Sequence, residues 1–442
     1  NPGRSINQLT TQGARISRRP LRLDAAAIAD GHSVSSAPGT VIIDIDDVAC
    51  RLLFAGHPAD ADRHPANADA VCKSLPTKVI TPALVNAHTH LDLTHIGPRP
   101  HAPADGFVSW IRMVMRHRAT DPAVIRASAM DGVRRSLAGG VAAAGDIAGG
   151  GSLIPLEALR HDAVGGVSYM EVFGIGSGEA RGTQEAEGWA ERSAAAGQPP
   201  ARIGVSPHAP YSAGPGAFRA SEREGVFACA HVAESIEERE LIRDGTGPFR
   251  SFLESLGVWD DALLEWFGRG LHPIDLAFEA MGEDRGGRWL FAHVNDCRDE
   301  DLARLAGRNV SVAYCARGHS YFGHPARLGP HRWREMLDAG INVCLATDSI
   351  INLPEGEGSA RISPLDEARF LWRSGCREAD TLLRMITSNP ARALGVHERY
   401  DLGGEAVGGM IAVEVGEMAR GERGEEAVMR SGGGVEWIAR GG

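Results

Sequence analysis

From Val79 onward, short apolar runs alternate with amphipathic stretches, and this alternation constrains the fold more than any other feature of the sequence. The runs are continuously apolar, as expected of strands buried on both faces, and the stretches between them have the apolar spacing of helices. Eight parallel strands connected by helices predict an α/β fold, a (β/α)8 TIM barrel. The eight runs are 83–90, 141–148, 166–174, 202–210, 225–234, 288–295, 310–317 and 341–349, and four expected helices are 122–138, 185–196, 299–306 and 363–374.

The ends of the chain have a different pattern. A barrel uses about 250 residues, fewer than the 442 present. Residues 1–78 and 397–442 contain short β-like runs broken by Gly, Pro and Asp, without a helical period. We expect these two ends to pair into a small β-sandwich domain beside a barrel domain of residues 79–396. The long connection over residues 244–287 contains helical spacing, and long barrel loops commonly shape substrate access.

Reactive side chains recur where the predicted strands end. In this type of barrel the active site forms at the C-terminal ends of the strands, so these residues are predicted to meet in one site. One His at a strand end is usually structural, but recurrence on six of eight strands is hard to obtain by accident. The residues are His88 and His90 on the first strand, His208 on the fourth, His231 and Glu234 on the fifth, His293 on the sixth, Arg317 on the seventh and Asp348 on the eighth.

Four of these residues are of the types that bind a divalent metal ion. Three imidazole nitrogens and one carboxylate oxygen suit Zn²⁺ best, while Fe²⁺, Mn²⁺ and Ni²⁺ are chemically permitted. A closed structural zinc site would typically use thiolates and would not need further titratable groups nearby, so we predict one catalytic ion. Such an ion lowers the pKa of a water that it binds from 15.7 to about 7. The predicted ligands are His88, His90, His231 and Asp348.

Six motifs resemble the amidohydrolase superfamily in order and spacing. They are VITPALVNAHTHLDL, SPHAPYS, HVAES, FAHVN, ATDS and TSNPARALGV, and they extend over residues 79–396. Within the superfamily the chain is similar to the one-metal branch, which contains cytosine, guanine, adenosylhomocysteine and aminofutalosine deaminases and the triazine chlorohydrolases. No Lys ends a strand where two-metal members carry a bridging carboxylated lysine, and Glu234 follows His231 by three residues. Both features favour the one-metal branch.

The resemblance implies a role for each strand-end residue. It places the four predicted ligands on the metal ion, and Asp348 would also orient a metal-bound hydroxide. Glu234 would act as the proton shuttle, taking a proton from the hydroxide and passing it to a ring nitrogen of the substrate. His293 would stabilise the tetrahedral adduct. His208 and Arg317 would contact the substrate, although the family's CPRS or CPxSN motif is replaced here by CARGH.

The resemblance also implies a reaction class. HTHLDL followed by FVSWIRMVMRHR, together with GPFRSFLESLGVW, is most similar to aminofutalosine deaminase-like members. We therefore expect a deaminase of an aminated purine nucleoside or related heterocycle. One alternative is a hydrolytic dechlorinase or cyclic-amide hydrolase that uses the same hydroxide, and another is a metal-free binding protein. Analysis of the product for ammonia, chloride or a new carboxylate distinguishes the reactions, and a metal assay tests the binding protein.

Composition excludes several kinds of partner. The net charge of −11 and the lack of any run of Lys and Arg argue against nucleic acid. No stretch approaches 18 consecutive apolar residues, and the first residues lack the apolar core of a signal peptide, so we expect a cytoplasmic protein without a membrane partner. A small-molecule substrate is the expected partner, and homodimers are common in the family that the chain resembles. The seven scattered cysteines are expected to be buried small hydrophobes.

Two further groups of polar residues are expected to face solvent. They are the helix-face glutamates Glu237, Glu238 and Glu240 and the loop histidines His319, His324 and His331. In the segment FVSWIRMVMRHR, we expect Trp110 to pack against other side chains. Arg112 in the same segment has two open roles, packing and substrate binding.

Overall fold

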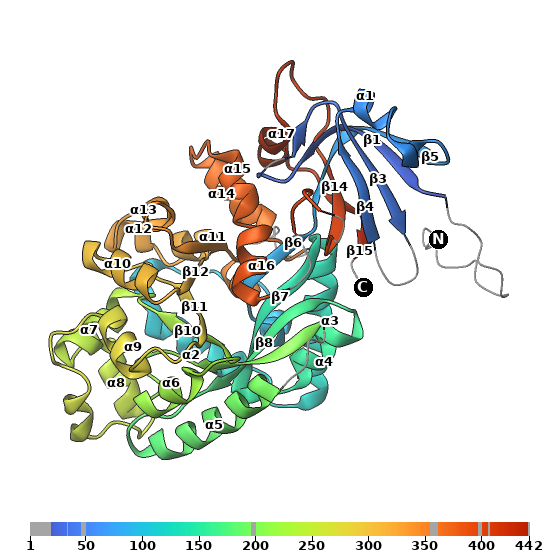
Figure 1. The fold of residues 1–442 in the computed structure, drawn as a ribbon. Coiled ribbons are helices and arrows are strands. Elements are labelled where there is room, and N and C mark those ends of the chain that lie inside the picture. Colours follow the sequence, from blue (N-terminus) through green and yellow to red (C-terminus); the bar gives the residue numbers. More distant parts are fainter. Residues whose placement is uncertain are drawn as a thin grey trace.

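The computed structural model describes residues 19–440 apart from 33, 46–49, 196–199, 354–360, 397–399 and 405–406. Its larger part is an eight-stranded parallel sheet whose strands follow one another in chain order, as the apolar runs predict (Figure 1). The fold class is therefore confirmed. The strands are β6 (Leu84–Thr89), β7 (Val141–Ala148), β8 (Gly165–Val172), β9 (Ala201–Pro207), β10 (Phe227–Val232), β11 (Arg288–His293), β12 (Ser311–Tyr314) and β13 (Asn342–Leu345).

The barrel closes between β6 and β13 through side-chain and loop contacts instead of a continuous ladder. Asn86 Nδ2 donates to Thr347 Oγ1 at 2.8 Å, and the Thr347 amide donates back to Asn86 Oδ1 at 3.1 Å. Further along, the Asp348 amide donates to the His88 carbonyl at 3.1 Å. These bonds hold the end of the first barrel strand next to the segment that follows the last one.

Helices surround the barrel (Figure 1). The expected helices are present: α3 and α10 lie as predicted, α5 begins at Glu179, earlier than expected, and α14 covers all but the two outer residues of its predicted range. The surrounding helices are α3 (Pro122–Ala138), α4 (Ile154–His161), α5 (Glu179–Ala195), α6 (Pro215–Ser221), α7 (Ile236–Asp244), α9 (Pro273–Met281), α10 (Asp299–Gly307), α11 (Ala316–Tyr321), α12 (His324–Arg327), α13 (Trp333–Asp338), α14 (Pro364–Arg373), α15 (Ala379–Arg384) and α16 (Ser388–Leu394).

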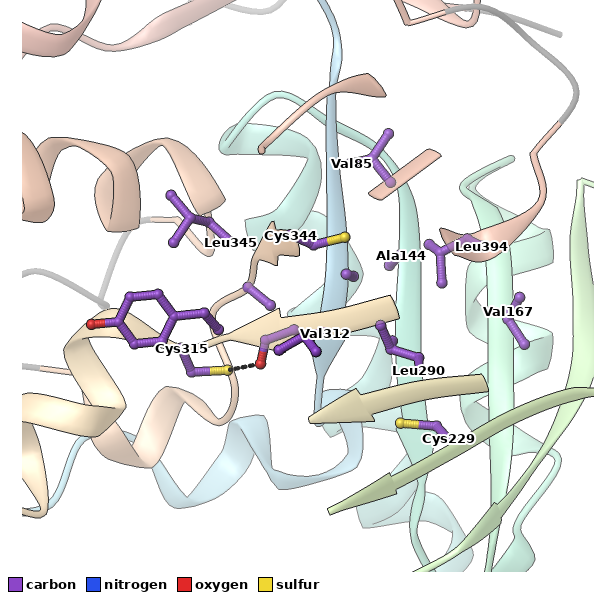
Figure 2. Packing of buried hydrophobic residues seen from close by; sticks show 14 of the residues in the cluster. Val85, Ala144, Val167, Cys229, Leu290, Val312, Cys315, Cys344, Leu345 and Leu394 are labelled. Atoms are coloured by element: carbon purple, nitrogen blue, oxygen red, sulfur yellow. Dashed lines mark hydrogen bonds between the residues drawn. The ribbon is translucent and has the colours of Figure 1, made fainter. Parts of the chain in front are cut away.

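The barrel interior is a packed apolar core. Short side chains of neighbouring strands meet there, and Leu394 of α16 packs against the same cluster (Figure 2). Four of the cysteines are buried as expected, whereas Cys72 is exposed and Cys297 is half-buried. Residues of this cluster from seven strands are Val85, Ala144, Val167, Cys229, Leu290, Val312 and Cys344.

The two chain ends pair, as the sequence predicts, in one hydrogen-bonded sheet of seven strands instead of the two sheets of a sandwich. The order is β15-β14-β5-β1-β3-β4, with β2 paired to β1. β5 joins both ends because it pairs in parallel with β1 and antiparallel with β14, and the expected domain boundary at residue 78 falls inside it. The strands are β1 (Leu21–Ala29), β2 (Ser35–Ser36), β3 (Gly39–Ile45), β4 (Cys50–Gly56), β5 (Val71–Pro82), β14 (Gly409–Glu414) and β15 (Val435–Arg440), with helices α1 (Pro58–Ala61) and α17 (Gly424–Arg430) beside them.

Two further helices, α2 (Phe107–His117) and α8 (Pro248–Ser255), share an apolar cluster with residues of the connection over 244–287. The expected helical spacing in that connection is confirmed by α8, by a 3-10 turn over Asp261–Glu265 and by α9. No helix of the described part of the chain is long and apolar enough to cross a membrane.

Candidate active site and metal centre

The four predicted metal ligands come together at the C-terminal ends of the barrel strands. His88, His90 and His231 each bring one nitrogen to within 4.8 Å of the others, and an overlapping group joins His88, His293 and Asp348 at the same spacing. Asp348 Oδ1 lies 3.5 Å from His88 Nε2 and 3.3 Å from His90 Nε2. All five side chains are more than four-fifths buried, so the cluster lies at the base of a cavity and not on the surface.

Local backbone geometry explains how these residues meet. His88 and His90 are two positions apart at the end of β6, so their side chains lie on the same face of the strand. Asp348 and His293 instead have positive φ angles of 55° and 74°, which non-glycine residues rarely adopt. Such conformations concentrate at functional sites, where the surrounding structure holds them in place.

The cluster fits a metal ion. His88 Nε2 and His293 Nε2 are buried and lack a hydrogen-bond partner among the described residues, a state that costs about 1–3 kcal/mol per group unless another species binds there. His231 Nδ1 lies 2.9 Å from the His208 carbonyl, which leaves Nε2 as its ligand atom. Imidazole nitrogens and carboxylate oxygens are ligands that zinc binds, and the cluster lacks the thiolates of most structural zinc sites.

The protonation states of His88, His231 and Asp348 favour metal binding. Burial lowers the pKa of His88 and lowers that of His231 strongly, so both rings are neutral, the form that binds a metal. Burial opposes ionisation of Asp348, but its contacts with His88 and His90 outweigh burial and hold its pKa well below the usual value. Burial likewise opposes a charged His90, yet its contact with Asp348 raises its pKa.

Glu234 lies beside the cluster in an environment that favours its protonated form. The side chain is 6% exposed, and Oε1 lies 3.4 Å from His293 Nε2. Burial and, secondarily, the charge of Asp348 raise the pKa of Glu234 well above its usual value. Burial lowers the pKa of His293 to about 3, so its imidazole is neutral. A carboxyl group that can hold a proton near neutral pH is suited to general acid–base chemistry.

The expectation that Glu237, Glu238 and Glu240 form a solvated helix face is wrong. Glu238 is fully buried and accepts hydrogen bonds from the amides of Ala233 and Glu234 at 3.1 and 2.7 Å. Glu237 is also buried and accepts a bond from Arg327, while Glu240 is half-buried. The start of α7 turns inward after β10, so Glu238 satisfies backbone donors beside the site and Glu237 pairs with Arg327 instead of meeting water.

A cavity of about 520 Å³ opens above the cluster. Its base contains His90, His231, Glu234, His293 and Asp348, and α2, α8 and the following loop supply an apolar roof. The roof residues include Trp110, Ile111, Val114, Phe252, Leu253 and Val258. The base is therefore chemically reactive, while the roof can cover an apolar surface of a ligand.

The two helices of the roof are linked by Arg112. Its Nη2 donates to Ser255 Oγ of α8 at 2.9 Å, and its guanidinium stacks over the Phe252 ring at 5.1 Å. Trp110 packs on Phe107 and Phe322, as expected, and also lines the cavity. Arg112 is thus a packing residue of the roof and is not among the cavity-lining residues.

One wall of the cavity holds a polar group that the sequence analysis partly missed. His208 lines the cavity as expected, with Glu171 and Arg118 beside it. Glu171 lies on β8, three residues before the third predicted apolar run ends at Gly174. Seeking a polar residue near the end of every predicted strand would have found Glu171, but Arg118, which follows α2, had no such signal.

Arg317 does not reach the cavity. It lies in α11, and its Nε and backbone amide donate to the two carboxylate oxygens of Glu367 at 2.6 and 2.8 Å. The side chain is 4% exposed and is absent from the cavity lining. The helix that begins at Ala316 turns the guanidinium away from the site, so the structure gives no support to the expected substrate contact.

The histidines that follow β12 are buried, so their expected place in a solvated loop is wrong. The segment folds into α11 and α12 and packs against the aromatic residues Tyr314 and Phe322. His331 stacks on the Tyr314 ring at 3.8 Å, and its Nε2 bonds the His293 carbonyl at 2.9 Å. Burial lowers the pKa of His319 to about 4 and those of His324 and His331 to about 3.

Comparison with known proteins agrees with this geometry. Residues 79–401 match the amidohydrolase family, which is more than half of the chain and includes every residue of the metal cluster. The chain belongs to the amidohydrolase family. It is therefore a metal-dependent hydrolase that acts on C–N bonds.

The chain is similar in sequence to one known enzyme and in fold to two solved structures. The chain is 28% identical to aminodeoxyfutalosine deaminase of Deinococcus radiodurans over 342 residues, 72% of this chain and 74% of that one. Its fold is similar to Helicobacter pylori aminofutalosine deaminase in complex with methylthio-coformycin, with a TM-score of 0.72 at 18% identity over 94% and 97% of the chains. It is also similar to a zinc complex of atrazine chlorohydrolase from Arthrobacter aurescens, with a TM-score of 0.68 at 17% identity over 95% of each chain.

Proposed function

We propose that this amidohydrolase is a deaminase of aminated purine nucleosides or related heterocycles, and that it uses one divalent ion, with Zn²⁺ the best fit. One observation carries the proposal: a buried Glu234 with a raised pKa lines the same cavity as His90 and His231 of the metal cluster. The similarity to aminodeoxyfutalosine deaminase of Deinococcus radiodurans supports the proposed substrate class. The similarity to the zinc complex of the Arthrobacter aurescens enzyme supports Zn²⁺ as the metal.

Hydrolytic deamination replaces an exocyclic amine by the oxygen of water and releases ammonia. The reaction needs one proton on the ring nitrogen next to the attacked carbon and another on the departing amine. A bound divalent ion supplies water that ionises near neutral pH. His88, His90, His231 and Asp348 would hold that ion.

Glu234 is the group in the cavity that can move these protons. Its raised pKa makes it a stronger proton acceptor than an ordinary carboxylate, and it can return the proton later in the cycle. The backbone fixes its position, because its amide donates to Glu238 at 2.7 Å and its carbonyl accepts from Asn295 at 3.0 Å. A carboxyl group held in this way serves both transfers on one face of the ring.

His293 would hydrogen-bond the attacking oxygen and so stabilise the adduct that forms as the ring carbon turns tetrahedral. Its neutral imidazole lies 3.4 Å from Glu234 and within the group that contains Asp348. A hydrogen-bond donor fixed where charge develops lowers the barrier without having to reorganise. The His331 bond to the His293 carbonyl helps to keep that backbone segment in place.

A product screen tests the proposal. Metal-replete protein is incubated with aminodeoxyfutalosine, adenosine and other aminated heterocycles, and ammonia and the ultraviolet change from an adenine-like to a hypoxanthine-like chromophore are recorded. We expect both signals together. Chloride from a chlorinated heterocycle, or a new carboxylate from a cyclic amide, without ammonia from any amine would contradict the deaminase and leave a different hydrolase.

A further inference from the structure

A buried carboxylate on the cavity wall is not used by the metal cluster or by the proposed proton transfer. Glu171 is 3% exposed, lies on β8 and lines the cavity together with His208 and Arg118. Burying an ionised group is costly unless it is paired, so such a residue needs a physical reason for its position. The neighbours of its two oxygens indicate that reason.

The two oxygens of Glu171 have different surroundings. Oε2 lies 3.3 Å from Arg118 Nη1 and accepts a bond from the Gly150 amide at 3.3 Å. Oε1 has no hydrogen bond among the described residues, although it belongs to a cavity-lining side chain. Burial favours the neutral acid, but the charge of Arg118 opposes burial and lowers the pKa of Glu171, so Glu171 is a carboxylate. One oxygen of a charged acceptor is therefore available to a ligand.

The charge around Glu171 selects the kind of ligand. Arg118 Nη2 also bonds Asp92 Oδ2 at 3.0 Å, so two carboxylates share one guanidinium. The cluster thus carries an excess of hydrogen-bond acceptors and of negative charge, which disfavours an anionic ligand and favours a hydrogen-bond donor.

The spacing of Glu171 and His208 fits one hydroxyl group. Glu171 Oε1 lies 4.0 Å from His208 Nε2, too far for a direct hydrogen bond. An oxygen placed between the two atoms can lie about 2.8 Å from each, the usual length of a hydrogen bond. A hydroxyl can donate to the carboxylate and at the same time bond the imidazole. The His208 ring is fixed for this role, since its Nδ1 bonds Ser212 Oγ at 2.5 Å.

We infer that Glu171 and His208 form a sugar subsite in which a ribose hydroxyl bridges Glu171 Oε1 and His208 Nε2. The inference rests on the proposed deamination of a nucleoside and deepens it, because it makes the enzyme selective for ribonucleosides over deoxynucleosides. Arg118 is a positioning residue in this subsite, since it holds the other oxygen of Glu171. The apolar roof on α2 and α8 would cover the less polar parts of the substrate.

The test compares substrates and variants in one set of measurements. The kcat/KM for ammonia release is measured with adenosine, 2′-deoxyadenosine and 3′-deoxyadenosine for the wild type, for Glu171→Gln and for the control Glu187→Gln on the exposed face of α5. A hydroxyl bound to a charged acceptor predicts a loss of about 10- to 100-fold for at least one deoxy substrate with the wild type and the control. Relative to the wild type, the kcat/KM of Glu171→Gln should fall by a similar factor with adenosine and should change little with that deoxy substrate.

Three other outcomes would contradict the ribose subsite or the place of Glu171 in it. Equal kcat/KM for the three nucleosides in the wild type overturns the subsite without needing any variant. Discrimination that is unchanged in a folded, metal-replete Glu171→Gln protein removes Glu171 from it. Absence of ammonia from all nucleosides, with turnover of another heterocycle, contradicts the proposed nucleoside function itself and removes the ribose subsite with it.

Discussion

At the scale of single residues, the proposed reaction depends most on Glu234, which lies next to the metal cluster without belonging to it. Glu234→Gln keeps the size of the side chain and removes its ability to exchange a proton. We predict an unchanged metal content and fold with a loss of at least about 100-fold in kcat, the usual range for a general acid–base group. Metal analysis and steady-state ammonia release check this, with Glu187→Gln as the matched control. A metal-loaded variant with near-normal turnover would remove Glu234 from the mechanism.

The buried histidines after β12 make a separate prediction about pH. The pKa of His324 is lowered to about 3, so between pH 6.5 and 3 the unfolded chain binds a proton at this residue that the folded chain does not. Stability therefore falls as the pH is lowered through that window. His324→Phe keeps an aromatic ring beside Phe107 and Phe322. It should remove the contribution of this one proton to the pH dependence of the unfolding free energy.

The size of this effect can be measured by chemical denaturation. The difference in unfolding free energy between His324→Phe and the wild type should grow in favour of the variant by about 1.4 kcal/mol for each pH unit below 6. The protein is kept at one zinc concentration throughout, so that the metal site contributes equally to both curves. Parallel curves from pH 7 to pH 4.5 would show that His324 is already charged in the folded state.

Residue-scale roles differ in how far they could be predicted from the sequence. His88 and His90 are two positions apart on a strand, a local spacing that fixes their common face and could be recognised directly. Burial of His319, His324 and His331 depends on distant aromatic neighbours, and nothing in the polar, glycine-containing local sequence indicates it. Arg317 had the correct position after a strand, but the partner that decides its orientation, Glu367, is 50 residues away.

At the scale of elements, the seam between β6 and β13 decides whether the ligands meet. Asn86 makes two buried hydrogen bonds to Thr347, next to Asp348. Asn86→Ala should lower the unfolding free energy by about 2–4 kcal/mol, because buried groups of Thr347 lose their partners. It should also weaken metal binding, since the spacing of His88 and Asp348 depends on the same seam.

A double-mutant cycle tests that seam. Thr347→Val removes the same side-chain hydrogen bond from the other strand end, so the two substitutions should be non-additive in denaturant unfolding. A double variant whose loss of stability equals the sum of the two single losses would show that Asn86 and Thr347 act independently.

The roof elements make a prediction about substrate binding. Arg112 links α2 to α8 through Ser255 and Phe252 at a largely exposed position. Arg112→Ala should raise KM about fivefold with little change in kcat, because one exposed cation–π contact and one hydrogen bond together contribute about 1 kcal/mol. Steady-state kinetics check this result. A fall in kcat with an unchanged KM would place Arg112 in the chemical step instead.

At the scale of the whole molecule, the barrel could be predicted more fully than the terminal sheet. Each barrel strand has its own continuous apolar run, so each of the strands β6 to β13 can be recognised in the sequence independently of the others. β5 and β14 instead pair across more than 300 residues, and strand-like composition at both chain ends cannot reveal their order or show that they share one sheet. The active site could be predicted to a similar extent, because its residues lie at the ends of strands that can each be recognised in the sequence.

We propose that one metal ion, held by the histidine cluster, supports release of ammonia from an aminated heterocycle. The most direct measurement removes metal with a chelator and restores Zn²⁺ in fractions of an equivalent while the rate of ammonia release is followed. The rate should rise linearly and stop rising at one ion per chain, and His90→Ala should show neither tight binding nor turnover. A break at two ions, full activity without metal, or restored metal without ammonia from any amine would contradict the account.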